Sequence, residues 1–202
     1  MQEKNFLYKV CKIIYKPLLF ILYRPKVYGR ENIPSSGKLI FAGNHKHAVD
    51  PTVVMSNTDR IVHFMAKEEL FKGLHGIIFN KMGLIKVHKD RNKNAVSVNI
   101  AENILNNNGT LGIFPEGTRN KNDNELLKFR YGTVRIAKKT NSLIIPFAIR
   151  GKYKLLKKGL EIEFGKPIDV KKLDIEQANS YLKDEVLRLL KNERFKRWNI
   201  YL

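Results

Sequence analysis

Residues 39–51 read LIFAGNHKHAVDP, and this stretch organises the chain around it. The first five residues are apolar, as in a buried strand, and the polar residues that follow indicate a sharp turn. Pro51 disfavours α geometry at Asp50 and suits the first position of a helix. We therefore predict a strand, a turn and then a helix that begins near Pro51, with Asp50 as its N-cap.

Two side chains in this turn are candidates for a general base and for the carboxylate that orients it, namely His45 and Asp50. On one continuous helix they would point in different directions, because a helix turns about 100° per residue. The predicted turn lets them meet, and the two carboxylate oxygens allow Asp50 to cap the helix and orient the imidazole together. Taken alone, the stretch also fits a polar loop with a capping aspartate.

Residues 114–119 read FPEGTR and form a second polar loop after an apolar run. Arg119 offers a planar fork that suits a phosphate, and exposed N–H groups of the loop can add donors. Glu116 can hold Arg119 in place or bind a hydroxyl. An ordinary turn with a surface ion pair is the alternative. The candidate phosphate-binding residues of this loop are Glu116, Gly117, Thr118 and Arg119.

Apolar runs alternate with helical patterns along the chain, which predicts a single α/β domain with a largely parallel central sheet flanked by helices. Because such sheets place ligands beyond the carboxyl ends of their strands, we expect the two polar loops to form one site. Pro146 favours an edge position or a bulge for its strand. The predicted strands are 38–42, 61–66, 84–87, 111–114, 143–149 and 160–164. The predicted helices are 51–56, 68–81 (broken around Gly73 and Gly76), 94–105, 132–139 and 175–190.

Residues 1–26 are predicted to form an amphipathic, membrane-associating helical segment ahead of a single globular domain at residues 27–202. Apolar residues cover most of this helix, whereas its lysines (Lys9, Lys12 and Lys16) share one narrow arc. The longest uncharged run is far short of the ~20 residues that a spanning helix needs. We expect the helix to lie in the membrane interface with its lysines toward lipid phosphates, and Pro17 to kink or divide it. Packing on the protein's own core or on a partner is the alternative.

The composition indicates a basic globular protein that binds polyanions. Among 202 residues, Lys and Arg number 38 and Asp and Glu number 19, for a net charge of +19. Nucleic acid, an anionic bilayer and phosphorylated substrates are the partner classes that this charge suits. A nucleic-acid-binding protein is disfavoured because the basic residues are spread out and no nucleic-acid motif is recognised. The single cysteine, Cys11, excludes an internal disulfide, and no Cys cluster or Glu-x-x-His motif indicates a metal.

These motifs resemble those of the glycerolipid acyltransferases. Residues 44–50 match the His-x4-Asp motif of that family, and residues 114–119 match its Phe-Pro-Glu-Gly-Thr-Arg motif, in the same order. Residues 67–90 are similar to the family's middle block, and residues 144–149 to its last block. The resemblance covers roughly residues 27–167, and its layout is closest to the bacterial 1-acylglycerol-3-phosphate acyltransferases. It implies that residues 27–202 form an acyltransferase domain. The chain departs from the family at His47 and Asn120, where Ser is common, and its middle block is a residue short.

The resemblance implies a reaction in which His45 removes the proton from the sn-2 hydroxyl of 1-acylglycerol 3-phosphate (lysophosphatidic acid). Asp50 would orient His45, and the hydroxyl would attack acyl-CoA or an acyl carrier protein thioester directly, giving phosphatidic acid. An acyl-enzyme is disfavoured because no Gly-x-Ser-x-Gly elbow is present. Nearby cations reinforce the phosphate site, and the middle block contributes Lys67, Lys89 and Arg91.

The resemblance also implies the setting of the enzyme. No cofactor is expected beyond the thioester substrate. The protein is expected at the cytoplasmic face of the cell membrane, as a peripheral or monotopic protein that binds anionic lipids and no nucleic acid. The alternatives are an acyltransferase for another lysolipid, a basic nucleic-acid-binding protein, and a non-catalytic protein of the membrane surface.

Overall fold

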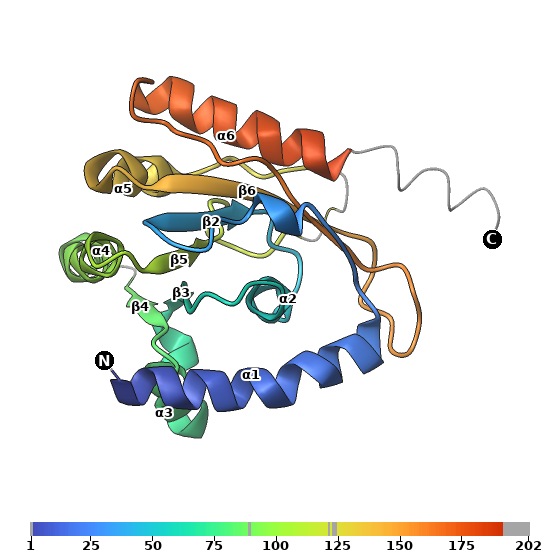
Figure 1. Ribbon diagram of the computed structural model, residues 1–202. Coiled ribbons are helices and arrows are strands. Elements are labelled where there is room, and N and C mark those ends of the chain that lie inside the picture. Colours follow the sequence, from blue (N-terminus) through green and yellow to red (C-terminus); the bar gives the residue numbers. More distant parts are fainter. Residues whose placement is uncertain (1, 89, 121, 123–124, 192–202) are drawn as a thin grey trace.

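A seven-stranded sheet runs through the centre of the protein in the computed structural model, which describes residues 2–88, 90–120, 122 and 125–191 (Figure 1). The strand order is β1-β7-β6-β2-β5-β3-β4, and every neighbouring pair is parallel except β6 and β7. The predicted α/β fold with a largely parallel sheet is therefore confirmed. The strands are β1 Lys26–Tyr28, β2 Leu39–Gly43, β3 Val62–Lys67, β4 Ile85–Val87, β5 Thr110–Ile113, β6 Leu143–Arg150 and β7 Glu161–Phe164.

Helices cover both faces of the sheet, so its central strands are buried on both sides. Along β2, Ile40 and Ala42 face one apolar cluster and Leu39 and Phe41 face the other, because successive strand side chains point to opposite faces. This double burial explains why the strand sequence is continuously apolar rather than alternating. The helices are α1 Gln2–Tyr23, α2 Asp50–Ser56, α3 Gly73–Lys81, α4 Arg91–Asn106, α5 Gly132–Thr140 and α6 Ile175–Leu190.

The predicted helices and strands are present, with boundaries that shift by a few residues. The predicted helix at 68–81 is a 3-10 turn, Glu68–Phe71, followed by α3, and Gly73 at the junction has φ +64°. Gly76 lies inside α3 and does not break it. The prediction missed β1, because a strand of three residues beside Arg24 and Pro25 shows no periodic pattern.

Pro146 was expected at an edge or a bulge. An edge position is excluded, because β6 pairs with β2 on one side and β7 on the other. The bulge is present: Phe147 pairs with Phe164 but Ile144 pairs with Ile168, so three residues lie opposite Ile145 and Pro146. The Pro146 carbonyl accepts a hydrogen bond from Gly165 N at 2.8 Å. In a strand, the N–H and C=O of one residue point to the same side, so the N–H that Pro146 lacks would point toward β7. On that side the regular ladder is interrupted between the Phe147–Phe164 pair and the Ile144–Ile168 bridge, and such an irregularity is where a strand tolerates a proline.

The first helix packs on the protein's own core with one face and leaves a second apolar face exposed. Tyr8 and Leu19 are buried, and Tyr8 Oη accepts a hydrogen bond from Val62 N at 3.1 Å. Pro17 does not divide α1, which is a single helix. Lys12 donates to Thr58 O instead of facing outward with the other lysines. The exposed apolar side chains of α1 are Phe6, Ile13, Ile14, Leu18 and Ile21.

No helix in the described part of the chain is both long enough and apolar enough to cross a bilayer.

Candidate active site

The two polar loops meet at the carboxyl ends of β2 and β5, which are neighbours in the sheet. The backbone of His45 joins them twice. Its N–H donates to Glu116 Oε1 at 2.9 Å, and its carbonyl accepts from Asn120 N at 2.6 Å. The single site that strand order predicts is therefore present, and its two loops hold each other in place.

His45 and Asp50 form the predicted pair, with Nδ1 of the imidazole 2.9 Å from Oδ2 of the carboxylate. The Asp50 side chain is fully buried, and its Oδ2 also accepts the backbone N–H groups of Lys46 and His47, each at 2.7 Å. A carboxylate with these donors is acceptor-only, so Nδ1 of His45 carries the hydrogen and Nε2 is left as the basic nitrogen.

The N-cap role predicted for Asp50 is wrong. The helix α2 already includes Asp50, and Val49 is its N-cap. The carboxylate instead points back into the preceding turn, where two backbone N–H groups and the imidazole converge on one oxygen. The turn is thus folded around the carboxylate, and the same contacts that close the turn orient the base.

Aromatic packing fixes the plane of the His45 ring. The imidazole stacks on Phe114 with ring centroids 4.0 Å apart and an angle of 16° between the planes. Phe114 is in turn stacked on Phe64 at 5.4 Å. Because Phe114 opens the second loop, the stack also couples the base to that loop.

Tyr153 is a member of the site that the sequence did not reveal. Its hydroxyl donates to Asp50 Oδ1 at 2.5 Å, and its ring stacks on His47 at 4.3 Å between centroids. Burial, and then the Asp50 charge, raises the pKa of Tyr153 above its ordinary value, so the hydroxyl keeps its proton. The same stack holds the ring of His47, the residue that stands where Ser is common in the motif. No motif marks Tyr153, which lies in a lysine-rich loop after β6.

Glu116 lies beneath the site rather than at its surface. It is 3% exposed, and its Oε2 accepts Asn120 Nδ2 at 3.1 Å and Leu127 N at 2.9 Å, while Oε1 accepts His45 N. The expected contact with Arg119 or a substrate hydroxyl is not what this geometry provides. Three N–H donors occupy the carboxylate, so Glu116 braces the loop that carries His45.

The remaining predicted phosphate-binding residues lie at the rim of the site. Thr118 and Arg119 are exposed, and Gly117 has φ +69°. A Cβ at Gly117 would lie 2.6 Å from Nε of Arg130, so the Arg130 guanidinium passes directly over this glycine. Lys67 is exposed at the carboxyl end of β3. Lys89 and the side chain of Arg91 lie outside the described residues, so their predicted contacts stay predictions.

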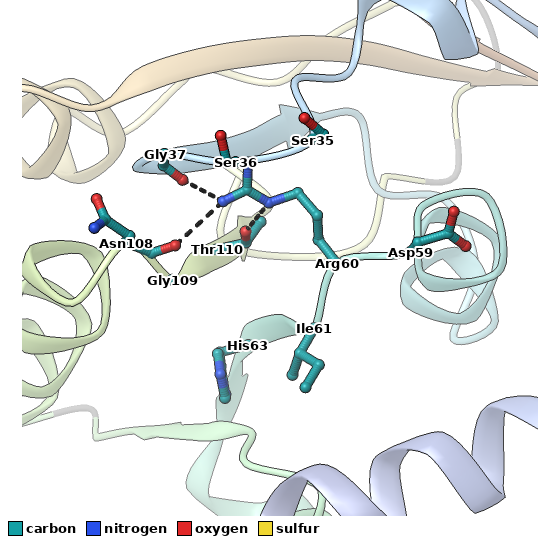
Figure 2. Close-up of a pocket in the computed structure, with 10 residues that line it drawn as sticks. All are labelled: Ser35, Ser36, Gly37, Asp59, Arg60, Ile61, His63, Asn108, Gly109 and Thr110. Carbon is teal, nitrogen blue, oxygen red and sulfur yellow. Dashed lines mark hydrogen bonds between the residues drawn. The ribbon is translucent and has the colours of Figure 1, made fainter.

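A cavity of about 440 Å³ lies at the opposite, amino-terminal edge of the sheet (Figure 2). Arg60 crosses it, and its guanidinium donates to Thr110 Oγ1 at 2.6 Å, Pro34 O at 3.1 Å, Asn108 O at 3.3 Å and Gly37 O. These bonds tie together the segments that precede β2, β3 and β5. The cavity is therefore separate from the His45 site, and its arginine clamps the strands.

Replacing Tyr153 with Phe is expected to lower kcat about tenfold and also to lower the thermal stability of the chain. The ring and its stack on His47 remain, but Asp50 loses one of four hydrogen bonds, and bonds to charged groups contribute about 1.5–3 kcal/mol. Steady-state kinetics and a melting curve measure the two effects, with Tyr181→Phe on exposed α6 as the control. Unchanged kcat would remove Tyr153 from the site.

Comparison with known proteins shows which family and which fold this chain resembles. Residues 24–150 match a family described as "Acyltransferase". A 1-acyl-sn-glycerol-3-phosphate acyltransferase of Bacillus subtilis is 30% identical over 168 residues, which are 80% of this chain and 82% of the relative. Another, from Borreliella burgdorferi, is 26% identical over 176 residues, which are 85% and 70% of the two chains. The fold is similar to that of the crystal structure of the 1-acyl-sn-glycerophosphate acyltransferase PlsC from Thermotoga maritima, with a TM-score of 0.75 at 23% identity, covering 95% and 79% of the chains.

Proposed function

This chain belongs to the acyltransferase family, and from that premise we propose that it acylates the sn-2 hydroxyl of 1-acylglycerol 3-phosphate to give phosphatidic acid. The observation that carries the proposal is the pair of His45 and Asp50, joined through the His45 backbone to the loop of residues 114–119. The pair supplies a base for an alcohol, and the loop brings cations next to it. The bacterial relatives are named for the same reaction.

In the proposed reaction, Nε2 of His45 takes the proton of the acceptor hydroxyl as its oxygen attacks the thioester carbonyl. The tetrahedral intermediate then expels the thiolate, which receives that proton from the imidazolium. Asp50 stabilises the imidazolium while it exists, and Tyr153, Lys46 and His47 hold the carboxylate in place. General base assistance of this kind contributes about 10²–10⁴-fold, and positioning supplies much of the remaining acceleration.

The phosphate of the acceptor is proposed to bind at the rim of the site, where exposed cations surround the 114–119 loop. Arg119 and Arg130 provide two guanidinium groups, which suit a phosphate better than ammonium groups because their N–H groups form a planar fork. Thr118 can add a hydroxyl donor, and Lys67 adds a charge at the end of β3. Lys89 and Arg91 of the middle block are proposed to complete this group.

The acyl donor is proposed to be acyl-CoA or an acyl carrier protein thioester, with no further cofactor. Both donors carry negative charge, so the +19 net charge of the chain favours either. Purified protein given each donor separately, with the same acyl chain, would show which supports turnover. Faster turnover with the carrier protein at low salt than at high salt would indicate recognition of its acidic surface.

The membrane surface is proposed as the place of the reaction, at the cytoplasmic face of the cell membrane. The exposed face of α1 carries five large apolar side chains, and Lys9 and Lys16 flank it. Such a helix lies in the interface between headgroups and acyl chains, with its cations at the lipid phosphates. The acceptor lipid resides in this same layer, so α1 would bring the site to its substrate.

A lysolipid panel tests the proposed acceptor. The protein should convert 1-acylglycerol 3-phosphate to phosphatidic acid with a kcat/KM at least about tenfold above that for lysophosphatidylcholine and lysophosphatidylethanolamine. The reason is that their headgroups mask one phosphate charge, and each lost charge-assisted contact costs about 1.5–3 kcal/mol. Detergent-dispersed substrates and product mass spectrometry keep membrane binding out of the measurement. A preference for another lysolipid would replace the proposed acceptor but retain the acyltransferase.

A further inference from the structure

We infer that the loop of residues 151–159, called here the lysine-leucine loop, is a second bilayer-binding element that inserts Leu155 and Leu156 into an anionic membrane. The loop reads GKYKLLKKG and contains four lysines and no acidic residue. This inference rests on the proposed action at a membrane surface and names which part of the chain, besides α1, would contact the lipid.

The two leucines leave most of their side chains exposed to water in the isolated protein. Leu155 is 62% exposed and Leu156 is 60% exposed, at the turn of the loop. Leu156 also has φ +59°, a left-handed conformation that disfavours side chains other than Gly, Asn and Asp. An exposed leucine in a strained backbone conformation does not stabilise the folded chain. Such a backbone outlier suggests a functional role.

The loop is held in a defined shape instead of being a loose tail. Its ends approach so closely that a Cβ on Gly151 would collide with the carbonyl oxygen of Gly159, as in a compact surface loop with a closed neck. Lys46 Nζ reaches the Gly151 carbonyl at 2.5 Å. Leu156 N donates to the Leu22 carbonyl at 2.6 Å, which attaches the tip to the end of α1.

The loop is continuous with the exposed apolar face of α1. Figure 1 shows the loop, in orange, beside the carboxyl end of α1, and Tyr23 at that end contacts Tyr153 edge-to-face at 5.3 Å between ring centroids. Leu18 and Ile21, in the last turns of α1, are exposed as well. Two adjoining elements therefore present large apolar side chains with lysines around them.

This combination fits a bilayer better than an acidic protein. Apolar side chains flanked by lysines match the boundary between acyl chains and anionic headgroups. The same loop carries Tyr153, whose hydroxyl bonds Asp50. Bilayer contact by the loop would thus bring the His45 site close to the membrane surface.

Vesicle partitioning of the full chain tests the inference, using phosphatidylcholine vesicles with and without phosphatidylglycerol. Leu156→Gly should lower the partition coefficient about tenfold, as should Leu155→Ser, since each removes a leucine from the bilayer. Lys157→Ser with Lys158→Ser should lower binding several-fold on anionic vesicles only, because each lysine contributes through the surface potential. Ile21→Ser on α1 is the positive control, and Val96→Ser, an exposed apolar residue of α4, is the negative control.

Leu156→Gly separates bilayer contact from a structural role. Glycine accepts φ +59° and keeps the N–H that bonds Leu22, which offsets the greater freedom that glycine gives the unfolded chain. The melting temperature should therefore change by only a few degrees while vesicle binding falls. A fall in melting temperature of the size that truncating a buried leucine causes would make Leu156 a packing residue and overturn the inference. So would vesicle binding that is unchanged in both leucine variants.

Turnover on detergent-dispersed substrate separates this inference from the proposed reaction. Both leucine variants should retain it, whatever their vesicle binding. If instead they bind vesicles normally and lose turnover only with an acyl carrier protein donor, the loop contacts that protein and the bilayer assignment is wrong. If the unaltered chain shows no turnover, the proposed reaction is contradicted. The vesicle experiment still tests the membrane contact of the loop, because it measures partitioning and not activity.

Discussion

Replacing His45 with Ala should lower kcat for phosphatidic acid formation by about 10³-fold, within the range of about 10²–10⁴ that a general base contributes. The imidazole is the group whose Nδ1 bonds the buried Asp50 and whose Nε2 remains basic. The variant should still fold, because the turn is closed by backbone N–H bonds to Asp50 that involve Lys46 and His47. KM for lysophosphatidic acid should change little, since the proposed phosphate contacts are at Arg119 and Arg130 and not at His45.

The control for this prediction is a second histidine far from the site. His63 lines the cavity at the amino-terminal edge of the sheet, where its Nδ1 lies 2.8 Å from the Gly83 carbonyl (Figure 2). His63→Asn offers an amide N–H near the same position and should leave kcat within about twofold, because no catalytic group is touched. Full activity in His45→Ala, measured with either thioester donor, would refute the assignment of the base.

Replacing Glu116 with Gln should lower both the stability of the fold and kcat. This result would distinguish a residue that holds the loop in place from one that binds the substrate. The buried carboxylate accepts from His45 N on one oxygen and from Asn120 and Leu127 on the other. A glutamine must turn its NH₂ toward one of these sets of donors. Leaving such a buried donor unsatisfied costs about 1–3 kcal/mol, so the free energy of unfolding should fall by about that amount.

The kinetic effect of Glu116→Gln should be a loss of about 10²-fold in kcat with KM for lysophosphatidic acid little changed. The His45 backbone would shift, and a displacement of about 1 Å in a catalytic group has an effect of this size. Urea unfolding and steady-state kinetics measure the two quantities. Glu125→Gln, an exposed carboxylate of the same loop, should change neither. A raised KM at unchanged stability would instead return Glu116 to the phosphate site.

In the loop of residues 114–119, the sequence predicted a substrate-binding role for exposed and buried residues alike. That role is compatible with the structure only for the exposed ones. Gly117, Thr118 and Arg119 lie at the surface, where the proposed phosphate role is compatible with their exposure. Glu116, two residues from Thr118, points inward because the loop turns at Pro115 and Gly117, and the Gly117 N–H bonds the Phe114 carbonyl at 3.0 Å. A motif gives the residue types of a loop, but burial decides which of them can meet a ligand.

Local signals explain why so much of the fold was predictable. Runs such as 39–43 and 143–149 are apolar throughout, and in an α/β domain such runs become central strands whatever their neighbours are. Pro146 predicted an edge or a bulge, and only the tertiary structure shows that its strand is central and that the irregularity is a register shift against the segment after β7.

By itself, the sequence determined the strand, turn and helix around residues 39–56, the second loop and the meeting of His45 with Asp50. Those features depend on residues within a few positions of one another and on the rule that parallel strands end at one edge. Only the tertiary structure decided that Tyr153 bonds Asp50 across 103 residues, that Glu116 braces His45 across 71 residues, and that the lysine-leucine loop lies against α1. Such contacts depend on strand order, and no local pattern encodes which distant loop the sheet will bring to the same end.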